Sequence, residues 1–73
     1  MQPEWIDVES SNIDAIAYEA DKSVLHVRFK SGSHYTYTEV GETSFERFKQ
    51  ADSKGRFFAQ FIRGFYPYEK VEG

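Results

Sequence analysis

Hydrophobic and polar residues alternate along the first half of the chain, which is the pattern of half-buried β-strands. Between residues 23 and 30, Leu25, Val27 and Phe29 alternate with polar residues. Similar runs precede this segment at 13–20 and follow it at 33–40. The polar pairs Asp21-Lys22 and Ser31-Gly32 separate the runs, and glycine is suited to the positive φ of tight hairpin turns. The pattern therefore predicts a three-stranded antiparallel meander.

The length of each turn decides which residues face each other across this sheet. If both turns are two-residue loops, Tyr18 lies opposite Leu25, Ile16 opposite Val27, and Arg28 opposite Tyr35. One face then forms the core, with Ile16, Tyr18, Leu25, Val27 and Phe29. The other face holds Ala15, Ala17, His26, Arg28, Tyr35 and Tyr37, and His34 is separated from His26. A three-residue loop at Ser31-Gly32 would instead turn both tyrosines into the core; we favour the two-residue loop.

After Gly41 the apolar period changes to that of helices. Thr43 and Glu46 match a capping box for a first helix, which buries Phe45, Phe48 and Ala51 and ends near Asp52. Ser53 is suited to cap a second helix, and Gly64 is suited to end it. Pro67 prevents further helix, so residues 65–71 are expected to be extended and able to add an edge strand. The sequence thus predicts an α+β fold with one domain at 10–71 and an arm at 1–9, whose Trp5 docks back on the domain.

Length and composition indicate one small domain. The chain has 73 residues and no cysteine, so neither disulfides nor a Cys-based zinc site stabilises it, while seven Phe, five Tyr and one Trp supply apolar mass. No apolar run is long enough to span a bilayer and no secretion signal is present, so we expect a cytoplasmic protein without membrane contact. Residues 1–42 carry three basic and eight acidic side chains, whereas residues 43–73 carry six basic and four acidic ones. This asymmetry suggests one basic end, although chance distribution of solvated charges also explains it.

Several short motifs, taken in order, resemble the KTSC domain, a module found alone in small bacterial and phage proteins and at the C-terminus of some lysyl-tRNA synthetases. They are Ser10-Ser11-Asn12-Ile13, Val27-Arg28-Phe29-Lys30-Ser31-Gly32, Tyr35-Thr36-Tyr37, the segment from Ala51 to Phe58, Ile62-Arg63-Gly64 and Tyr66-Pro67-Tyr68. The resemblance covers residues 10–71. It implies no biochemical activity, and the association with a tRNA synthetase implies only that RNA is a candidate ligand. Phe57 departs from the family, where a tyrosine is common.

Two groups of residues are candidates for a ligand site. The first is the start of the second helix, where unpaired backbone N–H groups and nearby cations favour an anion. The second is the sheet face with two tyrosines, because aromatic rings beside a cation can stack bases. Each has a simpler interpretation, as an ordinary helix cap and as a second small core. The candidate nucleic-acid or anion ligands are Arg28, Tyr35, Tyr37, Ser53, Lys54, Gly55, Arg56 and Arg63.

No catalytic, cofactor or metal site is predicted. The chain lacks a cysteine nucleophile, a serine elbow and a glycine-rich nucleotide fingerprint, and histidines on different faces cannot share a metal. We therefore predict a monomeric, non-catalytic binding module for RNA or another polyanion. The alternative is a protein–protein adaptor of bacterial or phage origin that uses aromatic anchors in the arm and tail, since aromatic residues are enriched at interfaces. Those anchors are Trp5, Phe65, Tyr66 and Tyr68.

Overall fold

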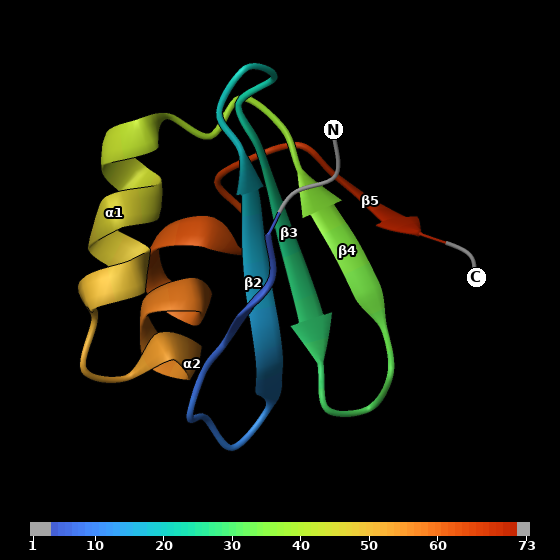
Figure 1. Ribbon diagram of the computed structural model, residues 1–73, viewed down its shortest axis with the longest axis vertical. Helices are drawn as coiled ribbons and strands as arrows, with labels where there is room; N and C mark the ends of the chain where they lie inside the picture. Colours follow the sequence, from blue (N-terminus) through green and yellow to red (C-terminus); the bar gives the residue numbers. More distant parts are fainter. Residues whose placement is uncertain (1–3, 72–73) are drawn as a thin grey trace.

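The computed structural model describes residues 4–71, which form a five-stranded antiparallel sheet with the helices on one face (Figure 1). The strands are β1 (Ile6–Asp7), β2 (Ile13–Glu19), β3 (Val24–Phe29), β4 (His34–Tyr37) and β5 (Tyr68–Val71), and they follow chain order across the sheet. The helices are α1 (Glu42–Gln50), α2 (Lys54–Phe57) and a π-helical turn, η1 (Phe58–Ile62), that continues α2. The predicted α+β class, with a meander, two short helices and an added C-terminal edge strand, is confirmed.

The predicted register between β2 and β3 is also confirmed. Tyr18 lies opposite Leu25, and Ile16 lies opposite Val27. A β-bulge lies between Ile13 and Ala15. The extra residue of a bulge shifts the alternation, so Ile13 joins the buried cluster on the same face as Ile16.

The predicted register between β3 and β4 is wrong by one residue. Val27, not Arg28, lies opposite Tyr35, and Leu25 lies opposite Tyr37. The backbone N–H of Phe29 donates to the carbonyl of Ser33 at 2.8 Å, which leaves a three-residue loop. Gly32 takes φ +100° in this loop, a conformation that glycine adopts without strain. Because a shift of one residue exchanges the two faces, both tyrosines lie on the core face.

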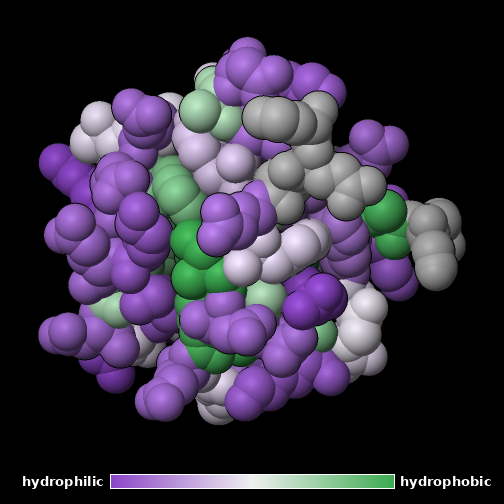
Figure 2. Space-filling view, viewed as in Figure 1, coloured by the Kyte–Doolittle hydropathy of each residue, from purple (hydrophilic) through white to green (hydrophobic). Residues whose placement is uncertain are grey.

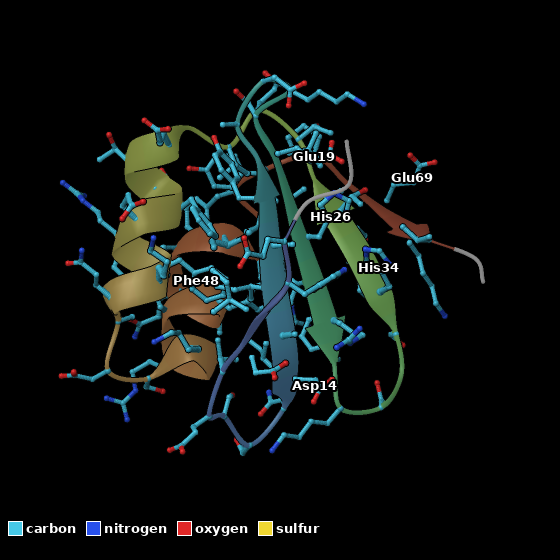
Figure 3. All side chains as sticks on the ribbon, viewed as in Figure 1. Asp14, Glu19, His26, His34, Phe48 and Glu69 are labelled. Atoms are coloured by element: carbon cyan, nitrogen blue, oxygen red, sulfur yellow. The ribbon has the colours of Figure 1, made fainter. Side chains whose placement is uncertain are left out.

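The core lies between the sheet and the helices. Phe45 and Phe48 of α1 and Phe58 and Ile62 of η1 pack on the apolar face of the sheet. Figure 3 shows Phe48 between α1 and the strands. The opposite face is covered in part by the N-terminal segment, so that Ala15 and Ala17 are fully buried as well. Figure 2 shows that the surface in the view of Figure 1 is mainly hydrophilic, with a narrow apolar strip near its middle.

The two helices begin in different ways. α1 begins at Glu42 after Gly41, and no side chain caps it, so the predicted capping box of Thr43 and Glu46 does not form. α2 begins after Ser53, whose Oγ accepts a hydrogen bond from the backbone N–H of Arg56 at 3.3 Å, as predicted. Gly64 follows η1 with φ +84°. A left-handed glycine is a common helix terminator, so this prediction is confirmed too.

The two edges of the sheet come from the two ends of the described chain. Ile6 and Asp7, within the segment predicted to be an arm, pair with β2. β5 pairs with β4, and all four of its residues are exposed. Between residues 4 and 71, no helix has the length and apolar character that crossing a membrane requires.

Candidate functional site: a tyrosine groove beside the second helix

A groove of about 460 Å³ runs between the α2–η1 segment and strands β3, β4 and β5. We call it the tyrosine groove, and it is lined by Asn12, Phe29, Tyr35, Tyr37, Gly55, Phe58, Ala59, Arg63, Gly64 and Tyr68. Its volume is within the range of ordinary small-ligand sites. The groove exists because the β4 tyrosines lie on the helix-facing side of the sheet and β5 extends that side beyond them.

Aromatic rings in mutual contact form the floor of the tyrosine groove. Tyr35 meets Phe29 at 5.7 Å and Tyr68 at 6.1 Å, both edge to face. Tyr37 meets Phe58 at 5.4 Å, also edge to face, and Tyr68 at 5.9 Å. Exposure changes along this floor, since Tyr37 is 5% exposed and Tyr68 is 65% exposed. The floor is therefore anchored in the core at one end and presents an open ring at the other.

Arg63 is the cation of the tyrosine groove. Burial, followed by the neighbouring Tyr35 and Tyr68, raises the pKa of Tyr37 to about 12, and the positive charge of Arg63 acts in the opposite direction. The Tyr37 hydroxyl is therefore protonated at neutral pH and can donate a hydrogen bond. Arg63 makes no ion pair with another residue of 4–71.

A second hollow, of about 480 Å³, adjoins the tyrosine groove. We call it the serine hollow, and it is lined by Ser11, Asn12, Phe29, Lys30, Ser31, Ser33 and Tyr35. It shares Asn12, Phe29 and Tyr35 with the tyrosine groove, so the two hollows adjoin, and we refer to them together as the depression. Among residues 4–71, no carboxylate lines either part, although the whole chain has a net charge of −3.

A third hollow has the opposite character. It measures about 320 Å³, and its lining includes Glu4, Glu42 and Glu46 beside the stacked rings of Tyr18 and Phe45. Among the residues that the structure describes, acidic side chains thus gather at this hollow and are absent from the lining of the other two. This separation of charge distinguishes the tyrosine groove and the serine hollow as the surface suited to an anionic ligand.

The residues at the start of α2, which the sequence suggests as an anion site, differ in how far they are engaged within the fold. The Lys54 ammonium donates a hydrogen bond to the carbonyl of Ala51 at 2.6 Å, so it is engaged within the fold. Arg56 is exposed, and Ser53 is used as a cap. Gly55 lines the tyrosine groove, where an added Cβ would lie 3.4 Å from Oγ of Ser10.

The structure brings together part of the predicted site. Tyr35, Tyr37, Gly55 and Arg63 all line the tyrosine groove. Arg28 does not join them, because the corrected register leaves it on the opposite face of the sheet. Sequence reasoning did not assign the other lining residues of the depression to the site. Among them are Asn12, Phe29, Lys30 and Tyr68.

Arg28 belongs to a polar and aromatic cluster on the opposite face. Its Nε lies 3.1 Å from Oδ2 of Asp14, and its guanidinium lies 4.8 Å from the centre of the Trp5 ring. Trp5 also contacts His26 and His34 edge to face, so the predicted docking of this residue on the domain is confirmed. An Arg28 held by a carboxylate and an indole is a structural residue of this face.

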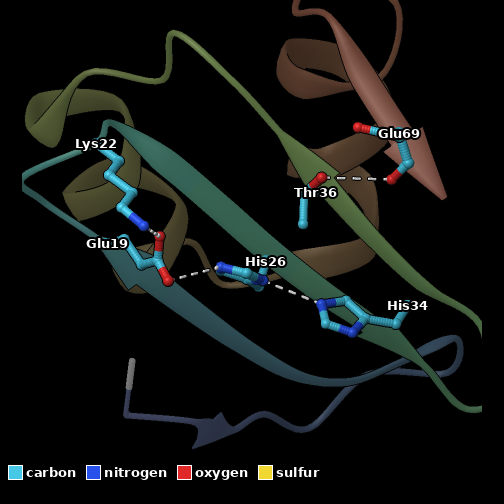
Figure 4. Close-up of polar contacts among 6 residues, drawn as sticks. All are labelled: Glu19, Lys22, His26, His34, Thr36 and Glu69. Carbon is cyan, nitrogen blue, oxygen red and sulfur yellow. Dashed lines mark hydrogen bonds and ion pairs between the residues drawn. The ribbon is translucent and has the colours of Figure 1, made fainter. Parts of the chain in front are cut away.

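The two histidines lie on the same face, contrary to the prediction. Nδ1 of His26 and Nε2 of His34 are 3.0 Å apart, and Nε2 of His26 lies 3.6 Å from a Glu19 carboxylate oxygen (Figure 4). Burial lowers the pKa of His34, and the neighbouring His26 and Arg28 lower it further. Within residues 4–71, no three His, Cys, Asp or Glu side chains are grouped to hold a metal ion.

Comparisons with known proteins agree on one family. The model of the KTSC domain matches residues 9–66. The chain is 41% identical over 63 residues to a lysine–tRNA ligase of Nostoc sp., covering 86% of this chain but only 11% of that ligase. A protein of Tsukamurella paurometabola is 42% identical, and the match covers 88% of its length. The crystal structure of a KTSC domain protein from Yersinia pestis superimposes with a TM-score of 0.91 and 35% identity, covering 97% of this chain and all of that one.

Proposed function

Because the chain belongs to the KTSC domain family, we propose that it is a non-catalytic binding module that holds unpaired RNA in the tyrosine groove. The observation that carries this proposal is the lining of the tyrosine groove. Among residues 4–71 it is lined by aromatic rings and the cation Arg63 and by no carboxylate, in a protein of net charge −3. Proteins that bind single strands use the same combination of stacking rings and a positively charged groove.

Each end of the tyrosine groove has a role in this proposal. Tyr68 offers an exposed ring on which a base stacks, while Tyr37 is buried and holds the floor in place. Arg63 contacts a phosphate, since a guanidinium forms two parallel hydrogen bonds with phosphate oxygens. An unpaired strand fits this site better than a duplex, because the bases of a duplex are already stacked on each other.

The lysine–tRNA ligases among the relatives support RNA as the ligand class. The matched segment is 11% of the Nostoc ligase, so the family occurs there as one part of a protein named for acting on tRNA. RNA binding by this chain alone is our proposal. The role requires access to RNA, and we therefore also propose a cytoplasmic location and action as a monomer.

The test is a titration of the isotope-labelled protein with single-stranded r(U4) at low salt, followed by two-dimensional NMR. We expect shifts at the lining of the tyrosine groove and a steep loss of affinity with salt, because bound phosphates release counterions. Arg63→Glu should abolish binding. Arg47→Glu, at an exposed residue of α1, makes the same charge change away from the groove. This variant should retain most of the r(U4) binding. Absence of shifts in the unsubstituted protein, or equal loss in both variants, would overturn the proposal.

A protein partner is the second candidate function, and the exposed residues near β5 favour it. Phe65, which lies between η1 and β5, is 68% exposed, and Phe61, which lies in η1, is 56% exposed. Exposed aromatic rings of this size often mark contact surfaces. Phe65→Ala should weaken capture of a protein partner while leaving r(U4) binding unchanged, because Phe65 does not line the tyrosine groove.

A further inference from the structure

Resting on the proposed function, we infer that the RNA site continues into the serine hollow, where Lys30 holds a second phosphate and the serine hydroxyls contact ribose. The ligand is then a strand of at least two ribonucleotides, and a single nucleotide fills the site only in part. Neither Lys30 nor any of these serines is needed for the site as proposed above.

The tyrosine groove and the serine hollow adjoin at Asn12, Phe29 and Tyr35, which line both. A ligand that extends from one hollow to the other therefore contacts these three residues at the junction. The rings of Phe29 and Tyr35 stand nearly perpendicular, at 80°, in the shared part. Each hollow alone has the volume of an ordinary small-ligand site, and together they suit a longer molecule.

The side chains that line the two parts differ in chemical type. The tyrosine groove is mostly aromatic, whereas the serine hollow carries Ser11, Ser31 and Ser33 on its rim. Serine hydroxyls both donate and accept hydrogen bonds, as does the ribose 2′-hydroxyl. Bases therefore suit the first part, and the sugar–phosphate backbone suits the second.

Positive charge is present in both parts of the depression. Lys30 is exposed, and it makes no ion pair with another residue of 4–71. It lines the serine hollow and not the tyrosine groove, while Arg63 lines the tyrosine groove and not the serine hollow. One cation thus belongs to each part of the depression. A strand that spans both parts can place a phosphate at each cation.

Hydrogen bonds hold the residues at the junction of the two hollows. The backbone N–H of Lys30 donates to the carbonyl of Asn12 at 2.8 Å, which ties the hairpin to the start of β2. Ser11 Oγ donates to Oδ1 of Asn12 at 2.7 Å and so orients that side-chain amide. The side-chain nitrogen Nδ2 of Asn12 donates to no other residue of 4–71, which leaves it able to contact a base edge.

The test compares uridine monophosphate, r(U4) and d(U4) by calorimetry over a series of salt concentrations. For Lys30→Gln, we expect the slope of log K against log salt for r(U4) to fall by about 0.7, the value for one phosphate of a single strand. Uridine monophosphate should bind this variant as it binds the unsubstituted protein. Lys49→Gln on α1 is the matched control. It should leave unchanged both the salt slope for r(U4) and the binding of uridine monophosphate. We also expect r(U4) to bind more tightly than d(U4).

The outcomes separate this inference from the proposed function. If Arg63→Glu abolishes r(U4) binding but Lys30→Gln leaves the slope unchanged, the site in the tyrosine groove stands and its extension is wrong. If r(U4) and d(U4) bind equally, the assignment of the serine hollow to ribose is wrong. If neither oligonucleotide binds the unsubstituted protein, both proposals are wrong. Lys30→Arg keeps the positive charge and should therefore keep the salt slope of r(U4) binding. A reduced slope in this variant would contradict the role of charge.

Discussion

His26 and His34 face each other across strands β3 and β4, with Nδ1 of the first 3.0 Å from Nε2 of the second. A hydrogen bond at this distance requires a proton on one nitrogen and a lone pair on the other. Glu19 lies beside the other nitrogen of His26, at 3.6 Å, and favours a proton there. We infer that His34 donates to His26, and that protonation of both rings breaks the pair.

We predict that this pair makes the protein sensitive to mild acid. Burial first, and then His26 and Arg28, lower the pKa of His34, so the unfolded chain takes up a proton at a higher pH than the folded protein does. The contribution of His34 to stability is therefore complete above pH 6.5, the ordinary value for histidine, and decreases as the pH falls through 6.5 towards the lowered pKa. Urea unfolding at pH 7.5 and pH 5 measures this loss.

His34→Gln is the matched variant for that prediction. Glutamine does not titrate, so the variant should lose less stability between the two pH values than the unsubstituted protein does. Lys22→Gln, which removes the exposed partner of Glu19, provides the comparison for a neighbouring charge. An unchanged loss in His34→Gln would show that groups other than His34 cause the acid sensitivity.

The two helix starts should respond differently to loss of a hydroxyl. Ser53→Ala removes the cap of α2 and should cost about 0.5–2 kcal/mol, nearer the lower value because the bond is 3.3 Å long. Thr43→Ala should cost almost nothing, because α1 has no side-chain cap. Chemical denaturation of the two variants measures the difference. A larger loss for Thr43→Ala would mean that the predicted capping box forms in solution.

Burial predicts a large contrast between two phenylalanines. Phe48 is fully buried and stacks on Phe57 at 5.6 Å, so Phe48→Ala should cost about 3–5 kcal/mol. Phe65 is 68% exposed, and Phe65→Ala should change the stability by no more than about 0.5 kcal/mol. The same denaturation experiment compares them. Similar losses would show that the exposed ring packs on something in solution.

Gly55→Ala should separate stability from binding. Gly55 lies in α2, where alanine is more favourable than glycine by up to about 1 kcal/mol, and the added Cβ would lie in ordinary contact, 3.4 Å from Ser10 Oγ. The same methyl group narrows the tyrosine groove. We expect equal or higher stability together with weaker r(U4) binding. Full binding by a stabilised variant would exclude this wall of the groove from the site.

The sequence predicted the fold more completely than the site, and the reason is the β3–β4 loop. Leu25 and Val27 alternate so regularly with polar neighbours that the core face of the central strand was determined. On β4 both possible faces are partly polar, with His34 and Thr36 on one and Tyr35 and Tyr37 on the other. The length of the β3–β4 loop therefore decides which face of the sheet Tyr35 and Tyr37 occupy, and the alternation of side chains does not reveal that length.

The remaining contributors to the site could not be found from local patterns. Tyr68 reaches the tyrosine groove only because β5 pairs with β4 across a separation of two helices. Asn12 reaches it through a hydrogen bond to the β3–β4 loop and a bulge at the start of β2. These contacts join distant segments, and the sequence carries no periodic signal for them. Arg63 and Gly55 were found because each belongs to a recognisable helix end.

The exposed edge strand β5 supplies Tyr68 to one wall of the tyrosine groove. β5 is a four-residue strand without buried side chains, so its detachment costs less free energy than opening of β2 or β3. When it detaches, Tyr68 leaves and the groove loses one wall while the core stays packed. Amide hydrogens of β5 should accordingly exchange with solvent much earlier than those of the central strands. If the groove binds RNA as proposed, bound RNA should slow that exchange by favouring the paired state of β5. The fraction of time that β5 is paired then sets an upper limit on the affinity for RNA.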